Sequence, residues 1–349
     1  MTQRLINRKT IIKSLIMNRK SLLGAICAVL ALGTSANVFA QDHVTGAAPS
    51  LLNSADPRAA GMGMATTAVG DNVFGIFGNA AANLFNEKSI GAGYSYNPVM
   101  PDLYEGSAIA THAVGAYWNI DDNNGLSLGF RYINGPKIQT TDATNALGET
   151  LRSNDMAVSL AYTRRIVDNF AISLTARYIR SDYTMFGDAF KVGNAATFDL
   201  GFYYDNTIDS FFGSKWAVGL NVSNLGTSLD ISSVSNPQSM PAYAKLGGSI
   251  DMPFSENHKL LAALDLGYTF MPSTDSSFNA GFGLEYNMYK YVFIRAGYHY
   301  GDEKSIGGSY ATVGLGVKAG PVRIDGSYWI GGSDSPIKNT WAVGLSLFF

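Results

Sequence analysis

The residues best suited to chemistry in this sequence are its four histidines, and they lie far apart, at His43, His112, His258 and His299. None of them has the spacing of a metal-ligand set. The chain also holds no phosphate-binding loop and no Cys-His pair that would mark a nucleophile. These observations predict a protein that is not an enzyme and that uses no metal or cofactor.

Two pairs of opposite charges are the remaining candidates, Glu285 with Arg295 and Arg323 with Asp325. Both pairs lie in segments where polar and apolar residues alternate, so each pair is predicted to lie on the polar side of its strands. We interpret them as ion pairs that hold the shape of a sheet. A cluster for transport or catalysis is the alternative interpretation.

The segment that shows the alternation most clearly is 338–349, at the end of the chain. One side of an extended strand would carry large apolar residues and the other side small ones. The apolar row is Trp341, Val343, Leu345, Leu347 and Phe349, and the small row is Ala342, Gly344 and Ser346. An apolar outside and a small, polar inside are typical of a strand in an outer-membrane barrel.

Fourteen segments of this kind follow one another from Lys88 onward. They are 88–97, 107–119, 125–134, 154–165, 168–181, 195–206, 214–224, 241–252, 257–270, 277–287, 290–300, 308–318, 320–330 and 338–349. Their polar rows carry Arg131, Arg177, Asp199, Asp265, Glu285, Arg295, Arg323 and Asp325. A charge that faces lipid near the midplane costs about 2–4 kcal/mol, so these residues are predicted to face a polar lumen.

The connections between the segments alternate in length. Short turns such as 121–124 and 166–167 follow the even-numbered segments, and long loops such as 135–153 follow the odd-numbered ones. Short turns at one rim and long loops at the other are typical of bacterial outer-membrane barrels, with both termini in the periplasm. The predicted fold is therefore all-β, a 14-stranded antiparallel transmembrane β-barrel over 88–349.

Composition supports the same class of protein. Charged residues make up only 15% of the chain, against about 25% in typical soluble domains. After the first forty residues no stretch approaches the ~18 unbroken apolar residues that a membrane helix needs. Six of the 25 Lys and Arg lie in those first forty residues, so 19 remain against 27 Asp and Glu, a net charge of −8. An acidic chain of this kind gives no support to nucleic-acid binding.

The N-terminal region divides into two parts. Residues 1–40 have a basic start, the apolar run Leu22 to Leu32 and the small residues of Val38-Phe39-Ala40, which predicts a signal peptide cleaved before Gln41. An uncleaved membrane anchor is the alternative. The single cysteine, Cys27, lies inside this segment, so the mature protein is predicted to have no disulfide.

The segment 41–87 is rich in small and turn-forming residues and alternates poorly. Ser54 or Asp56 is positioned to cap a short helix with Pro57 as its first residue. Many Gly and Ala residues permit close packing, so we predict that this segment folds back into the barrel as a plug. A leader packed against the first strand is the alternative.

Two of the long loops carry apolar residues where solvent exposure is expected. Exposed aromatic and Met side chains are favoured anchors for a protein partner. The candidate partner-binding residues are Met185, Phe186 and Phe190 in one loop, and Leu229, Ile231 and Met240 in the other. The alternative is that these loops fold inward over the barrel mouth.

Three stretches resemble the PorV family, outer-membrane barrels of the type IX secretion system in Bacteroidetes. The stretch 56–63, Asp-Pro-Arg-Ala-Ala-Gly-Met-Gly, is similar to the family's D-A-R-A-G-G-M-G segment. The stretch 216–227, with Trp216, Gly219 and Ser223-Asn224-Leu225-Gly226, resembles its W-x-x-G-x-x-x-S-N-[IL]-G segment. The stretch 240–249, from Met240-Pro241 through Lys245-Leu246-Gly247-Gly248, resembles its [IL]-P-x-x-x-[RK]-L-G-[GT] segment.

This resemblance implies a FadL-like barrel with an N-terminal plug. It further implies a non-enzymatic shuttle in the cell outer membrane, which binds the C-terminal signal domain of secreted cargo. The implied partners are that cargo, the type IX translocon, the surface sortase-like attachment complex and outer-membrane lipid. A FadL-like channel for hydrophobic small molecules is the first alternative. A lipid-modifying enzyme is the second, since family members have been linked to lipid A deacylation.

Overall fold

A computed structural model describes residues 48–52, 54–101, 109–141, 147–209, 211, 213–233, 235–302, 307–333 and 335–349. The predicted signal peptide, 1–40, lies outside the described residues, as does the start of the predicted plug, 41–47.

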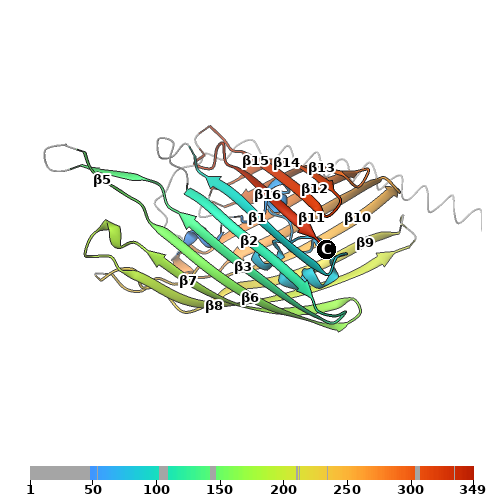
Figure 1. The fold of residues 1–349 in the computed structure, drawn as a ribbon, viewed down its shortest axis with the longest axis horizontal. Helices are drawn as coiled ribbons and strands as arrows, with labels where there is room; N and C mark the ends of the chain where they lie inside the picture. The colour runs from blue at the N-terminus through green and yellow to red at the C-terminus, as the bar shows by residue number, and fades with distance from the viewer. Residues whose placement is uncertain are drawn as a thin grey trace, which may run out of the picture. The chain divides into compact units, whose positions relative to one another are not determined.

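Fourteen antiparallel strands close into one barrel (Figure 1). They are β1 (Ile90–Val99), β2 (Ile109–Asn119), β3 (Asn124–Asn134), β6 (Asn154–Val167), β7 (Phe170–Asp182), β8 (Val192–Ile208), β9 (Ser214–Gly226), β10 (Tyr243–Ser255), β11 (His258–Thr269), β12 (Ser277–Met288), β13 (Val292–Gly301), β14 (Tyr310–Ala319), β15 (Val322–Ile330) and β16 (Trp341–Phe348). Each of the fourteen predicted segments corresponds to one of these strands. The predicted fold class is confirmed.

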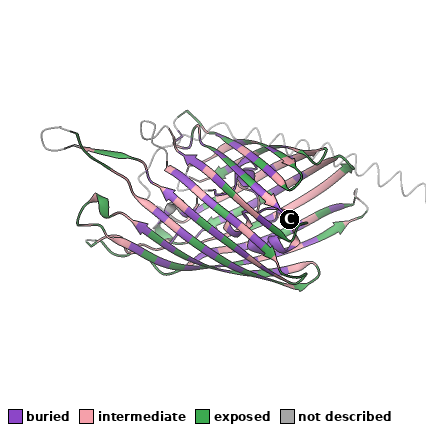
Figure 2. Ribbon diagram, in the orientation of Figure 1, coloured by how far each residue is buried: buried purple, intermediate pink, exposed green. Residues whose placement is uncertain are grey.

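The alternation in sequence becomes an alternation in exposure around the wall (Figure 2). On β16, Trp341, Val343 and Leu345 are exposed, whereas Ala342 and Ser346 are buried toward the inside. All eight charged residues that were predicted to face the lumen are at most 9% exposed. The barrel therefore has an apolar outer surface and a polar interior.

The barrel closes where the first and last strands meet. β1 pairs with β16 along its length, from Gly91 opposite Phe348 to Tyr96 opposite Val343. The N–H of Phe349 donates to the carbonyl of Ile90 at 2.8 Å, and the N–H of Ile90 donates back to Phe349 at 3.1 Å. Since every strand has two neighbours, the sheet has no free edge.

Connections of unequal length separate the two rims, which we call the turn end and the loop end. The turn end holds the short connections, such as that from β2 to β3, together with the start of β1 and the end of β16. The loop end holds a feature that the alternation did not predict. Within the long connection from β3 to β6, β4 (Ile138–Thr141) and β5 (Leu147–Leu151) pair as a separate hairpin.

Short helices complete the described chain, and most precede the barrel. They are η1 (Pro49–Leu52), α2 (Pro57–Gly61), η2 (Gly75–Phe77), η3 (Ala80–Phe85), η4 (Thr184–Phe186) and η5 (Ser273–Asp275). As predicted, Asp56 caps α2, accepting the N–H of Arg58 at 2.8 Å, and Pro57 is the first helical residue. Among the described residues, no helix has the length and apolar character to cross a membrane.

Candidate functional site

The N-terminal segment 54–87, which we call the plug, lies inside the barrel (Figure 1). Close backbone contact is possible because the wall carries glycine where the plug passes. A Cβ built on Gly297 would lie 2.2 Å from the N of Gly63, and one built on Gly283 would lie 2.5 Å from the O of Met62. Gly63 itself has a φ of +60°, a conformation that glycine adopts at little cost. Side chains larger than hydrogen at these positions would push the plug off the wall.

A chain of buried ion pairs joins the plug to the wall. Arg58 of the plug pairs with Glu285 at 2.7 Å, and Glu285 also pairs with Arg295 at 2.6 Å. Arg295 reaches Asp325 at 2.8 Å, and Asp325 in turn pairs with Arg323 at 2.8 Å. The two pairs proposed from sequence are therefore present, and they belong to one network with the plug.

Arg58 is the member of this network that the sequence did not reveal, because 227 positions separate it from Glu285. Its guanidinium also donates to the carbonyls of Gly70 and Asp71 at 2.9 and 3.2 Å. Burial by itself disfavours its charge, but the Glu285 carboxylate outweighs burial and raises the pKa of Arg58. A permanently charged, bidentate residue thus ties two turns of the plug to β12.

A second buried carboxylate holds the middle of the plug. Asp265 on β11 accepts the N–H groups of Thr66 and Thr67 at 3.1 and 3.0 Å and the Thr67 hydroxyl at 2.6 Å.

A further buried ion pair lies in the wall away from the plug. Arg177 pairs with Asp199 and donates to Asn224. Asn224 lies in the Ser-Asn-Leu-Gly stretch, with φ of 62° and its N–H donating to Asp199 at 2.8 Å. That stretch therefore has a structural role at the end of β9.

Two cavities at the two ends of the plug share no lining residue. A third, of about 60 Å³, lies among plug residues and shares Leu52, Ser54, Met64, Tyr243 and Lys245 with the cavity at the loop end. The loop-end cavity, of about 110 Å³, is lined by Ser54, Lys245, His299 and Trp329 among others. The turn-end cavity, of about 530 Å³, is lined by many charged residues, including Arg58, Glu285 and Arg323. The lumen is thus polar and divided by the plug.

At the loop end, the connections from β7 to β8 and from β9 to β10 pair with each other. The N–H of Lys191 donates to Ile231 at 3.0 Å, and the N–H of Ser233 donates to Ala189 at 2.8 Å. The Lys191 ammonium pairs with Asp230 at 2.7 Å. We call these connections, 183–191 and 227–242, the paired loops.

The first of the paired loops presents an apolar surface. Met185 is 46% exposed and Phe190 is 37% exposed, with Phe186 half-buried between them. The Phe186 ring lies 6.2 Å from Tyr183 and 6.1 Å from Phe190, so the three rings form one cluster. Burial raises the pKa of the Tyr183 hydroxyl, and the nearby Asp155 charge adds to this. The cluster therefore remains uncharged.

The candidate residues of the second paired loop point the other way. Leu229 is 1% exposed and Met240 is 3% exposed, in a cluster with Ile179, and Ile231 packs against it. Leu229 and Met240 are thus buried, whereas Ile231 is half-buried, as Phe186 is. Of the six candidates, Met185 and Phe190 are exposed, and partner binding by the six residues stays a prediction.

One sequence pattern that resembles a catalytic motif has a structural explanation. Residues 125–129 read Gly-Leu-Ser-Leu-Gly, which matches the nucleophile elbow of hydrolases, a strand-to-helix turn. Here the five residues lie within β3, and the Ser127 hydroxyl accepts the amide of Asn83 at 3.0 Å. The pattern is therefore no elbow. In the part of the chain that the structure describes, no group of three or more His, Cys, Asp and Glu residues could hold a metal ion.

Together, the closed wall, the apolar outer surface and the filled lumen define an outer-membrane β-barrel of fourteen strands. The sequence profile described as type IX secretion system protein PorV matches residues 36–276, which is more than half of the chain. The chain belongs to the PorV family, whose members are outer-membrane components of the type IX secretion system. The predicted family is confirmed. No match is found among curated proteins.

Solved structures of similar fold include two toluene transporters. The Ralstonia pickettii toluene transporter TbuX has a TM-score of 0.57 and 12% identity, covering 84% of this chain and 98% of that chain. The Pseudomonas putida toluene transporter TodX has a TM-score of 0.56 and 13% identity, covering 85% and 98%. At these identities the likeness shows the fold alone, and it confirms the predicted FadL-like barrel.

Proposed function

We propose that this protein binds the C-terminal signal domain of secreted cargo at its loop end. It then carries the cargo from the translocon to the surface attachment complex, without catalysing a reaction. The observation that carries the proposal is the apolar surface that the paired loops form in this member of the PorV family. They present Met185, Phe186 and Phe190 as one uncharged apolar surface, held in place by backbone hydrogen bonds. In a mature barrel whose termini lie in the periplasm, this surface faces the cell exterior.

The interior supports a role in binding rather than conduction. The plug is fixed by buried ion pairs and by glycine contacts with the wall, and it separates the two cavities. Ligand pockets for drug-sized molecules are typically about 300–1,000 Å³ and mostly apolar. The loop-end cavity, of about 110 Å³, is below that range, and charged residues line the turn-end cavity.

A channel for a hydrophobic small molecule is the second candidate function, and one observation favours it. The fold is shared with TbuX and TodX, whose structures are described as toluene transporters. If the protein is such a channel, a strain that lacks it should lose uptake of the hydrophobic molecule while type IX secretion stays normal.

The test is a double substitution, Met185→Asp with Phe186→Asp. The two new carboxylates would be buried against the partner in the complex, which opposes binding. We therefore expect capture of cargo to fall by at least about tenfold and secreted cargo to accumulate without being attached. Leu147→Asp is the matched control, since Leu147 is 79% exposed on the separate hairpin β5. Heat-modifiable migration on gels checks that each barrel is folded. Normal capture by the folded double variant would remove this surface from the proposal.

A further inference from the structure

The short helix η1, which precedes the plug, packs against the second of the paired loops. Leu51 of η1 and the neighbouring Ala48 are 7% and 4% exposed. They belong to one buried apolar cluster with Leu229 and Met240 of that loop and with wall residues of β6, β7 and β8. The N-terminal segment therefore supplies part of the surface on which this loop rests.

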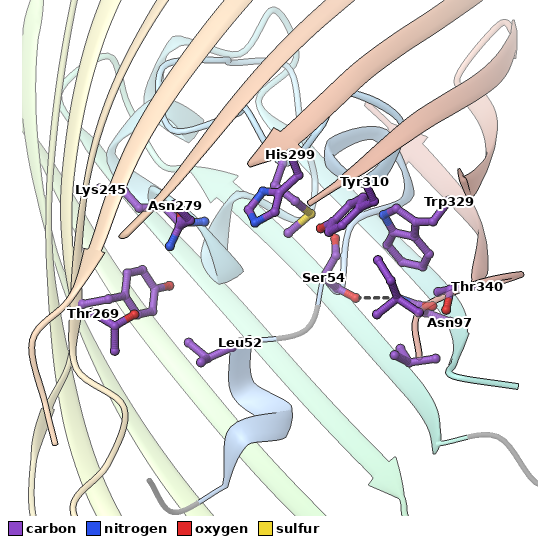
Figure 3. Close-up of a pocket in the computed structure, with 14 residues that line it drawn as sticks. Leu52, Ser54, Asn97, Lys245, Thr269, Asn279, His299, Tyr310, Trp329 and Thr340 are labelled. Atoms are coloured by element: carbon purple, nitrogen blue, oxygen red, sulfur yellow. Dashed lines mark hydrogen bonds between the residues drawn. The ribbon is translucent and has the colours of Figure 1, made fainter. Parts of the chain in front are cut away.

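A wall arginine holds η1 in place. Arg131 of β3 is 6% exposed, and its Nη1 donates to the carbonyl of Leu51 at 2.8 Å. The same guanidinium lies 4.4 Å from the centre of the Phe77 ring of the plug, a cation–π contact. Leu52, the last residue of η1, lines the loop-end cavity (Figure 3). Because a hydrogen bond from a charged group is stronger than a neutral one, Arg131 fixes η1 relative to the wall.

The second loop connects the buried cluster with the exposed rings of the first loop. Two residues after Leu229, the carbonyl of Ile231 accepts the N–H of Lys191 at 3.0 Å, and Lys191 directly follows Phe190. A Cβ built on Gly193, near the start of β8, would lie 2.6 Å from the Ile231 side chain, so this part of the loop lies against the wall. A change in the packing of Leu229 is therefore expected to move the aromatic surface of the first loop.

We propose that η1 positions the surface that the paired loops present to cargo. Leu51 fills the buried cluster next to Leu229 and Met240, and Arg131 keeps it there. Replacing a buried leucine by a smaller residue leaves a cavity, so the second loop would lose its support and the rings of the first loop their fixed arrangement. By linkage, a ligand that orders the loops also stabilises the docked form of η1. The consequence for cargo rests on the function proposed above, whereas the packing of the loops does not.

Labelling of a single thiol in the second loop tests the packing. Met240→Cys places this thiol at a residue that is 3% exposed, in a mature protein predicted to have no other cysteine. We expect Leu51→Ala to raise the rate of maleimide labelling of the purified barrel by at least about tenfold, whereas Leu51→Met, which conserves volume, should leave it nearly unchanged. The matched control is Leu84→Ala, because Leu84 is 4% exposed and belongs to η3, outside this cluster. It should leave the labelling rate unchanged.

A matched pair of arginines tests how η1 is held. Arg165 donates to the carbonyl of Leu84 at 2.9 Å and lies 4.7 Å from the centre of the Phe85 ring, so it makes at η3 the contacts that Arg131 makes at η1 and the plug. Arg131→Met should raise the labelling rate of the position-240 thiol by about tenfold, since a hydrogen bond from a charged group contributes about that factor. Arg165→Met should leave the rate unchanged.

Capture of cargo by the same variants separates the packing from the function. The expected result is faster labelling and weaker capture in Leu51→Ala, and neither in Leu84→Ala. Faster labelling with normal capture would support the packing and count against the proposed function. Unchanged labelling in a Leu51→Ala barrel that is folded by heat-modifiable migration would overturn the inference, as would equal acceleration by Leu51→Ala and Leu84→Ala.

Discussion

Arg58→Met is expected to release the plug while leaving the barrel closed. Arg58 is 6% exposed and makes two hydrogen bonds to Glu285, at 2.8 and 2.7 Å, besides those to the plug carbonyls. Removing one partner of a buried ion pair costs about 3–5 kcal/mol. Since Glu285 keeps Arg295 as a partner at 2.6 Å, the lower end of that range applies, about 3 kcal/mol. The docking equilibrium of the plug then shifts roughly 100-fold toward the undocked form.

Cysteine labelling measures this shift directly. The only cysteine of the chain is Cys27, in the predicted signal peptide, so the mature protein offers a cysteine-free background. Val73→Cys places a thiol in the plug at a residue that is 0% exposed. We expect maleimide to label this thiol roughly 100-fold faster when Arg58 is replaced by Met. Arg58→Lys keeps the charge but loses the bidentate geometry, so its labelling rate should lie between the two.

The control is Arg164→Met, which removes an exposed arginine that donates to Asn124 at 2.7 Å on the turn end. It should leave the labelling rate unchanged, because exposed polar contacts contribute about 1 kcal/mol or less. An unchanged rate in a folded Arg58→Met barrel would refute the role given to the ion-pair network. A labelling rate of the position-73 thiol in Glu285→Gln equal to that in the otherwise wild-type protein would strengthen that refutation.

Two further predictions concern the wall and its closure. Gly297→Ala should also speed labelling of the thiol introduced at position 73, by roughly 10-fold or more, because the new Cβ would lie 2.2 Å from the N of Gly63 and overpacking costs about 1–3 kcal/mol. The control is Gly326→Ala, whose Cβ would have its nearest atom 3.9 Å away and which should leave the labelling rate unchanged. Equal labelling rates in the two variants would contradict the packing argument. Deletion of Phe349 removes the two backbone hydrogen bonds to Ile90 and an exposed aromatic residue at the rim, so barrel assembly should slow. A pulse-chase experiment that follows heat-modifiable migration on gels measures the rate of assembly. Assembly at the wild-type rate would count against the role given to Phe349.

The barrel was predictable from sequence because each strand carries its own signal. Alternation fixes which face of a strand meets lipid, and a charged residue such as Arg295 or Asp325 cannot face lipid at low cost. Pairing of neighbouring strands then follows from short turns, so Glu285 was correctly matched with Arg295 across β12 and β13. Information of this kind is local, and so the sequence reveals it.

Contacts between distant segments were not predictable in the same way. Arg58 lies 227 positions from Glu285, and no periodic pattern connects a plug residue with a particular strand. Loops have no fixed face, so apolar composition alone did not distinguish exposed Met185 from buried Leu229. The hairpin of β4 and β5 was missed because its residues are mostly exposed on both faces, which leaves no alternation to detect.

The most direct test of the proposed function is site-specific photo-crosslinking in cells that secrete cargo. A photoreactive residue at position 185, in the paired loops, is predicted to crosslink to a secreted protein through its C-terminal signal domain. The same residue at position 123, in an exposed turn at the opposite rim, should give no such product. Crosslinks from both positions, or from neither in a folded and abundant barrel, would contradict the account.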